Sequence, residues 1–301
     1  MDRGKIANAI KAGKILCADG AWGTLLMEKG FRIGESSALW SLDRPDDVMD
    51  IANAYINAGA DMIQTNSFGG TCFRLSNFGL ANKASEINEA AAHISRAAAG
   101  AGRWVIASAG PAGGFSEAEK MPYKDLYAAF KEQALALEKG GADAICIETM
   151  MSIRQATTAI KAAKENTSLE IICTYAFQPA QNGGMKTIAG EPSKEACMAA
   201  AESGADIVGA NCCSSIDHMV NMVKEVRCAL PYIPIMVQAN AGLPVVNENG
   251  EKYYPSTPEA MAVDAIRFID AGANIIGGCC GTTPAHIRAI KTVISGEYNH
   301  V

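Results

Sequence analysis

The chain has 301 residues, of which 49% are hydrophobic and 19% are charged, and its formal net charge is -6. This acidic balance argues against a nucleic-acid-binding surface and favours small molecules or proteins as partners. Charged residues interrupt the first 14 positions and no later apolar run approaches membrane-spanning length, so we expect no secretory signal, no membrane span and a cytoplasmic location.

Short apolar runs recur along the chain, and each is followed by a turn and an Ala-rich helical stretch. Apolar strands that alternate with helices are typical of a parallel sheet covered on both faces. Eight such strands predict closure into a (β/α)8 TIM barrel, with a doubly wound open sheet as the alternative. We expect one domain over residues 1–301. The predicted strands lie at 15–18, 61–64, 104–107, 144–147, 171–174, 206–209, 235–238 and 274–277.

A short phrase, Gly-Ala-Asp or Gly-Ala-Asn, precedes every second predicted strand. Its glycine is expected to end the preceding helix in the left-handed conformation, and the Ala-Asp or Ala-Asn pair leads into the strand. The phrase therefore indicates a repeated joint of the barrel rather than a chemical site. It occurs within residues 58–61, 140–143, 203–206 and 271–274.

Cysteines are the most informative residues for function. In a reducing compartment, ten cysteines are better interpreted as core residues, metal ligands or nucleophiles than as disulfides. Cys279 and Cys280 are adjacent on a glycine-rich turn after an apolar run, and Cys212 ends another such run. Three thiolates and one open position are typical of a catalytic zinc site. We expect Cys213 to point away from this site into the core if the strand pleat persists.

Barrel active sites form on the loops that follow the carboxyl ends of the strands, and polar motifs stand at these ends. With these motifs in order, the chain resembles the zinc-dependent homocysteine S-methyltransferase family. A further segment at 238–244 resembles the homocysteine-binding module of cobalamin-dependent methionine synthase. The motifs are Asp19-Gly20, Thr65-Asn66-Ser67-Phe68-Gly69, Ile147-Glu148-Thr149, Asn211-Cys212 and Gly278-Cys279-Cys280-Gly281.

The resemblance implies the same barrel, with Zn2+ bound by Cys212, Cys279 and Cys280. An amino-acid thiol needs an anionic partner for its ammonium group, and Glu148 and Asp19 are the candidates. Simpler alternatives are that Glu148 caps the next helix and that Asp19 braces its glycine turn.

Two loops offer further substrate contacts. The backbone amides of Ser67, Phe68, Gly69 and Gly70 are candidates for the substrate carboxylate because glycine lets main-chain N–H groups approach an anion closely. Asn66 and Asn240 are further candidate ligands, and Asn240 is a candidate for the open zinc position. Turn formation is the alternative for both asparagines.

We therefore expect an enzyme that methylates a thiol, in which the zinc-bound thiolate of homocysteine attacks a methyl donor to give methionine. The resemblance favours methylcobalamin on a separate corrinoid protein as the donor, with S-methylmethionine or betaine as alternatives. Another alternative is methyl transfer from a different substrate to a corrinoid protein. The non-enzymatic alternative is a zinc-containing docking subunit for a corrinoid protein. A lyase or hydrolase that uses zinc-bound water ranks last because we find no metal-ligating His or carboxylate.

Overall fold

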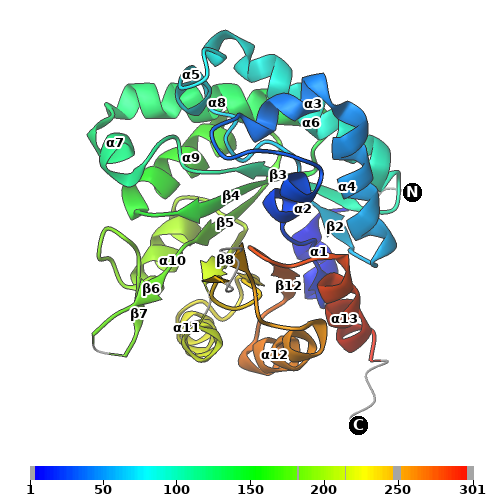
Figure 1. Cartoon of the computed structure of the whole chain (residues 1–301). Coiled ribbons are helices and arrows are strands. Elements are labelled where there is room, and N and C mark those ends of the chain that lie inside the picture. The colour runs from blue at the N-terminus through cyan, green and yellow to red at the C-terminus, as the bar shows by residue number, and fades with distance from the viewer. Residues whose placement is uncertain (1–3, 182, 214, 247–251, 297–301) are drawn as a thin grey trace.

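The computed structural model describes residues 4–181, 183–213, 215–246 and 252–296. Eight parallel strands form one sheet that curls into a barrel inside a layer of helices (Figure 1). The order of the strands around the barrel follows the chain, and Asp61 N donates to Cys17 O at 2.8 Å where β1 and β2 meet. The strands are β1 (Leu16–Cys17), β2 (Met62–Ile63), β3 (Trp104–Ala109), β4 (Ala144–Met150), β5 (Glu170–Tyr175), β8 (Ile207–Cys213), β9 (Ile235–Ala239) and β12 (Ile275–Gly278).

All eight predicted strands are present, and the predicted TIM barrel is confirmed. The two ends of the expected 1–301 domain, residues 1–3 and 297–301, lie outside the described residues. None of the described helices is both long enough and apolar enough to span a membrane.

The helices form where the sequence combines apolar periodicity with cap residues. α12 is an example: Pro258 occupies its first turn, the hydroxyl of Thr257 accepts from Ala260 N at 3.3 Å, and left-handed Gly272 ends it. The helices are α1 (Ile6–Lys11), α2 (Trp22–Glu28), α3 (Trp40–Asp43), α4 (Pro45–Asn57), α5 (Cys72–Ser76), α6 (Ala84–Ala99), α7 (Phe115–Lys120), α8 (Tyr123–Lys139), α9 (Ile153–Asn166), α10 (Ser193–Glu202), α11 (Ile216–Ala229), α12 (Pro258–Ala271) and α13 (Pro284–Ile294).

The repeated joint has the predicted left-handed glycine, and the structure explains the acid that follows it. Gly204 has a φ of 109°, and Asp206 Oδ2 accepts from Ile171 N at 2.9 Å, which ties β8 to β5. The aliphatic stem of Lys164 lies 3.5 Å from where a Cβ of Gly204 would be, with its ammonium 3.7 Å from Asp206. Equivalent hydrogen bonds run from Cys17 N to Asp61, from Val105 N to Asp143 and from Ile235 N to Asn274.

The interior of the barrel is closed at its amino-terminal end by α1. Ile6 and Ile10 pack into an apolar cluster inside the strands, and the carboxylate of Glu170 accepts from Ile6 N at 2.7 Å and from Ala7 N at 2.8 Å. The sequence indicated only that this segment lacks the features of a secretory signal, and the plug was not predicted.

The opposite end of the interior is polar. Side chains alternate along a strand, so residues two positions beyond the apolar interior residues also face inward. At this end they are polar and buried, and they form the floor of a site at the carboxyl ends of the strands. These residues are Gln64, Ser108, Glu148, Thr174 and Gln238, and Asn211 continues the inward face of β8 beyond Gly209.

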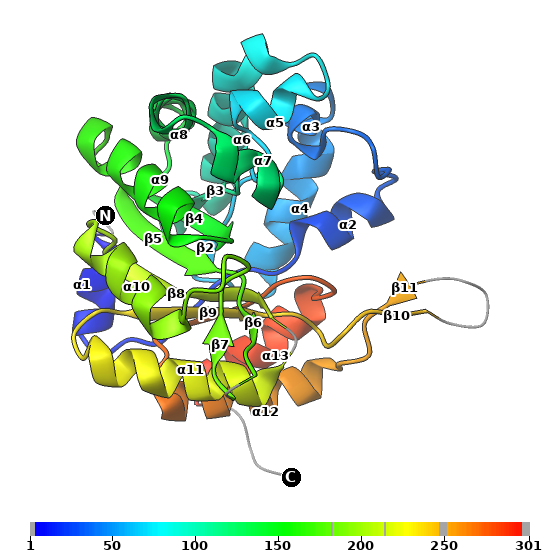
Figure 2. The same cartoon turned by 90° about the vertical axis from the view of Figure 1, so that its left-hand side faces the viewer.

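Two small hairpins extend from the loops on this carboxyl-end side. β6 (Gln178–Pro179) pairs with β7 (Met185–Lys186), and β10 (Val245–Val246) pairs with β11 (Lys252–Tyr253). Figure 2 shows β10 and β11 projecting from the barrel on the side away from α1. Neither hairpin was predicted.

Candidate active site

The structure brings together the three cysteines that the sequence indicated. The Sγ atom of Cys212 lies 2.7 Å from that of Cys279 and 3.9 Å from that of Cys280. All three sulfur atoms lie within 4.8 Å of one another, and all three residues are partly buried. Within the described ranges, this is the one cluster of three or more His, Cys, Asp or Glu side chains arranged to hold a metal ion.

An irregularity in β8 aims Cys212 at the cluster. The register with β9 pairs Asn211 with Gln238 and then Cys213 with Ala239, so Cys212 is an extra residue. Cys212 also has a φ of 55°, which is uncommon outside glycine. A bulge of this kind redirects a side chain. Cys213 packs in the core as predicted, although the pleat on which that prediction depended is interrupted.

Backbone hydrogen bonds from two neighbouring loops hold the turn with the vicinal cysteines. Cys279 N donates to Ala239 O at 2.8 Å, and Ala241 N donates to Cys280 O at 2.9 Å. On the other side, Gly278 N donates to Asp19 O at 3.0 Å. The loops that follow β1 and β9 therefore fix both sulfur atoms of the turn.

The cysteine cluster favours one anionic charge and resists more. Hydrogen bonds from Cys212 and then Cys279 lower the pKa of the Cys280 thiol to about 3. The pKa of Cys279 is raised by its hydrogen bonds with Cys212 and Cys280 and by burial. Further thiolates would need a cation among them, and three sulfur donors suit a soft divalent metal such as Zn2+. The donor set thus fits a metal ion.

Two buried carboxyl groups lie in the floor of the site. Asp19 Oδ2 accepts from Trp22 Nε1 at 2.8 Å and from Gln64 N at 2.7 Å, while no hydrogen-bond partner for Oδ1 is found among the described residues. Burial raises the pKa of Asp19 to about 7 against these hydrogen bonds. Burial also raises the pKa of Glu148, although the hydroxyl of Ser108 donates to it. A cationic ligand would favour the ionised form of both groups.

The loop after β2 already uses part of its hydrogen-bonding capacity. Ser67 N donates to Thr65 O at 2.8 Å, and Gly70 N donates to Ser67 O at 2.9 Å. For the amides of Phe68 and Gly69 we find no partner in the described parts of the chain, so these two are the donors that remain for an anion. The ring of Phe68 lies against Gly110 and is 38% exposed.

The two candidate asparagines differ in their surroundings. The side-chain amide of Asn66 donates to Ser37 O at 2.8 Å, so it anchors the segment before α3. Asn240 follows β9, and its backbone N donates to Cys213 O at 3.0 Å, which places it beside the cysteine cluster. The geometry therefore supports a structural role for Asn66 and keeps Asn240 as a candidate ligand.

Comparisons with known proteins agree with this geometry. The homocysteine S-methyltransferase family matches residues 16–294. The chain belongs to this family. The family resemblance predicted from the strand-end motifs is thereby confirmed, and the family is one of methyltransferases.

Methionine synthases are among the similar proteins, but they are much longer. The methionine synthase of Mycobacterium leprae (strain TN) is 29% identical over 304 residues, which is 94% of this chain and 24% of that protein. The Mycobacterium tuberculosis (strain ATCC 25618 / H37Rv) methionine synthase is also 29% identical, over 302 residues, 94% of this chain and 25% of that protein. The chain thus spans about a quarter of the length of these relatives.

A solved structure of a homocysteine methyltransferase shares the fold. The metallated form of MmuM from Escherichia coli superimposes with a TM-score of 0.77 at 21% identity, covering 95% of this chain and 98% of that one. The oxidized form of the same protein gives a TM-score of 0.79. At this level of identity, the likeness supports the barrel fold.

Several polar residues of the candidate site were not selected from the sequence. Gln64, Ser108 and Gln238 line the floor, and the side chains of Ser108 and Gln64 hydrogen-bond to Glu148, which opposes the rise that burial causes in its pKa. Asn211 and Thr149 bind each other across the strand ends. The alternation of side chains along each strand could have indicated Gln64, Ser108 and Gln238, because each lies two positions beyond an apolar residue that faces the barrel interior.

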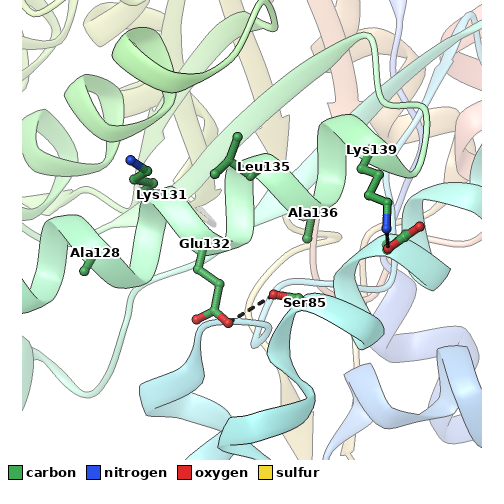
Figure 3. A pocket seen from close by; sticks show the side chains of 8 residues that line it. Ser85, Ala128, Lys131, Glu132, Leu135, Ala136 and Lys139 are labelled. Carbon is green, nitrogen blue, oxygen red and sulfur yellow. Dashed lines mark hydrogen bonds and ion pairs between the residues drawn. The ribbon is translucent and has the colours of Figure 1, made fainter.

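A separate depression of about 450 Å3 lies on the outer helical layer between α6 and α8 (Figure 3). Lys139 pairs with Glu89 at 2.8 Å, and the hydroxyl of Ser85 donates to Glu132 at 3.1 Å. No cysteine lines this depression, so it lacks the sulfur donors of the cysteine cluster.

Proposed function

We propose that this chain transfers a methyl group to the thiol of homocysteine, giving methionine, with Zn2+ held by Cys212, Cys279 and Cys280. The observation that carries the proposal is that three sulfur atoms within 4.8 Å of one another stand at the same end of the barrel as two buried carboxyl groups. A ligand with a thiol and an ammonium group matches this combination. Family membership supports the same reaction.

Different residues of the chain bind different groups of the substrate. Asp19 and Glu148 accept the substrate ammonium, which replaces the solvation that both carboxyl groups lose on burial. The amides of Phe68 and Gly69 receive the carboxylate. Asn240 lies beside the cluster and orients the groups around the sulfur.

The cysteines set the chemistry of the centre. Bound Zn2+ would keep the substrate thiol deprotonated at neutral pH, where a free alkyl thiol is mostly protonated. Three thiolates give the centre a net negative charge, which leaves electron density on the substrate sulfur. The methylated product is a neutral thioether, and its loss of charge favours release.

We propose a methyl-corrinoid protein as the donor, with methylcobalamin carried by that separate partner. The support is the similarity to methionine synthases, of which this chain spans about a quarter. S-methylmethionine and betaine remain alternative donors. The ten free cysteines suit a reducing compartment such as the cytoplasm.

The test is to incubate the zinc-loaded protein with homocysteine and, in separate reactions, methylcobalamin, S-methylmethionine or betaine, and to measure methionine. Product with methylcobalamin alone supports a corrinoid partner. Product with an onium donor alone replaces that part of the proposal. No product in any reaction, from protein that holds about one zinc per chain, rejects homocysteine methylation with these donors.

Cysteine variants connect the reaction to the metal centre. Cys212→Ala and Cys280→Ala are expected to lose zinc and activity together while the circular dichroism spectrum is unchanged. Cys228→Ala is the matched control, because Cys228 is exposed and lies on α11 outside the cluster. Methyl transfer that persists in the first two variants would reject the zinc-thiolate mechanism, and zinc without any methyl transfer would favour a docking subunit.

A further inference from the structure

Two residues at the carboxyl ends of β4 and β8, the strands on either side of β5, share an unusual backbone conformation. Thr149 has a φ of 59° and Cys212 a φ of 55°, and no other non-glycine residue in the described part of the chain has a positive φ. Thr149 directly follows Glu148, and Cys212 directly follows Asn211. Such conformations are unfavourable, most of all for a β-branched residue, and persist where surrounding contacts enforce them.

One buried side chain contacts both irregular segments. Asn211 Oδ1 accepts from Thr149 N at 2.8 Å and from the hydroxyl of Thr174 at 2.9 Å. Its Nδ2 donates to the hydroxyl of Thr149 at 2.7 Å and lies 4.0 Å from the Sγ of Cys279. An asparagine amide has two donors and two acceptor positions, so these four contacts use all of them.

We propose that Asn211 is a positioning residue that fixes the distance between the carboxylate of Glu148 and the sulfur of Cys212. This inference rests on the proposed function, in which Glu148 binds the ammonium group and Cys212 the metal. Asn211 holds Thr149 in its left-handed conformation through both the backbone N–H and the hydroxyl. The turn at Thr149 directs Glu148 into the floor, and the turn at Cys212 directs the sulfur to the cluster.

The arrangement has a consequence for specificity. An amino-acid thiol binds both Glu148, through its ammonium group, and the metal beside Cys212, through its sulfur. A simple alkyl thiol has no ammonium group and binds only the metal. Loss of Asn211 should therefore weaken homocysteine binding more than propanethiol binding. A residue that served only the stability of the barrel would affect both thiols equally.

The experiment measures the affinities of Co2+-substituted protein for homocysteine and for propanethiol, using the visible absorption of the cobalt–thiolate centre. Asn211→Ala is expected to weaken homocysteine binding about tenfold and propanethiol binding less than about threefold, as for loss of a buried hydrogen-bonding group. It should also shift the cobalt bands. Thr174→Val is the matched control, because it removes one partner of Asn211 and leaves Thr149 in place.

A second substitution tests the backbone argument. Glycine adopts positive φ without support, so Thr149→Gly in the Asn211→Ala background should recover about threefold or more of the homocysteine affinity. If Asn211→Ala does not fold, Asn211→Ser, which is too short for the same four contacts, takes its place. Equal losses for both thiols, or no recovery with Thr149→Gly, would overturn the inference. Wild-type protein that binds Co2+ but neither thiol would instead overturn the proposed function, and the inference with it.

Discussion

The Sγ atoms of Cys212 and Cys279 lie 2.7 Å apart although the two residues are 67 positions apart in the chain. Cys212 is farther from Cys280, at 3.9 Å. A metal ion bound by all three cysteines protects thiols this close from oxidation. When the metal is removed, they can form a disulfide. The cluster should therefore respond to oxidants in a metal-dependent way.

We predict that chelated protein treated with diamide forms the Cys212–Cys279 disulfide in preference to the vicinal Cys279–Cys280 disulfide. Diamide takes up the two electrons and two protons that the thiols lose. Peptide mapping by mass spectrometry would identify the linkage, and zinc-loaded protein is the protected control. A predominant vicinal disulfide would show that the close approach of Cys212 to Cys279 does not govern the reaction.

A second prediction concerns Asp19, whose pKa burial raises to about 7. An aspartate in an unfolded chain has a pKa of about 3.9. Between these values the folded protein keeps a proton that the unfolded chain loses, so the contribution of Asp19 to stability falls as pH rises through this window. Asp19→Asn removes the penalty. Its Oδ1 can accept from Trp22 and Gln64 as Oδ2 of Asp19 does, and its Nδ2 takes the position of the unpartnered oxygen.

We therefore expect the melting temperature of Asp19→Asn to exceed that of the wild type at pH 8 and to approach it at pH 4. Homocysteine affinity should fall about tenfold because an ammonium partner is lost. Thermal scans across pH and binding titrations measure the two effects, with the exposed Asp270→Asn as a control. A variant that binds homocysteine as well as the wild type would remove Asp19 from the proposed site.

The sequence was sufficient to predict the barrel because its strands are near-continuous apolar runs and a repeated phrase marks the joints. It was also sufficient to place Cys212, Cys279 and Cys280 on one face, since all three follow strand ends. The bulge at Cys212 was not predictable from these signals, because a left-handed cysteine depends on contacts with β4 and β5 that are distant in sequence.

Other omissions have the same physical origin. The plug formed by α1 depends on Glu170, which binds the backbone of residues more than 160 positions away. The capacity of the Ser67–Gly70 turn for anions was overestimated from its glycines, because two of its amides are engaged within the turn. Local patterns thus predicted the elements, while long-range hydrogen bonds decided which groups remain available.

The joints of the barrel give a prediction about stability alone. Asp206→Ala leaves the backbone N–H of Ile171 without its side-chain acceptor, and we expect a loss of about 1–3 kcal/mol in the free energy of unfolding. Lys164→Ala should cost less than about 1 kcal/mol, because its ion pair with Asp206 is long and partly exposed. Urea unfolding measures both. Equal losses would mean that the ion pair, rather than the hydrogen bond to the strand, stabilises the joint.

The last prediction concerns Gly281, which follows the vicinal cysteines. Its φ is 82°, and a Cβ at this position would lie 2.1 Å from Cγ of Tyr254, whose ring covers the turn. Gly281→Ala therefore combines backbone strain of about 1–2 kcal/mol with a steric clash. Because the shift required would move Cys280, we expect zinc affinity to fall about tenfold or more together with stability.

The two causes can be separated. Tyr254→Ala in the Gly281→Ala background removes the clash and leaves the strain. Because Tyr254 also hydrogen-bonds to Cys280, Tyr254→Ala alone is the reference, and in its background Gly281→Ala should reduce zinc affinity less than it does in the wild type. Gly23→Ala on α2 is the matched control: a Cβ there meets no atom within 4 Å, and alanine favours a helix, so zinc affinity should be unchanged and stability equal or higher. Chelator competition measures zinc affinity and urea unfolding measures stability. An equal loss of zinc affinity from Gly281→Ala with and without Tyr254 would show that strain, and not the ring of Tyr254, makes glycine necessary beside Cys280.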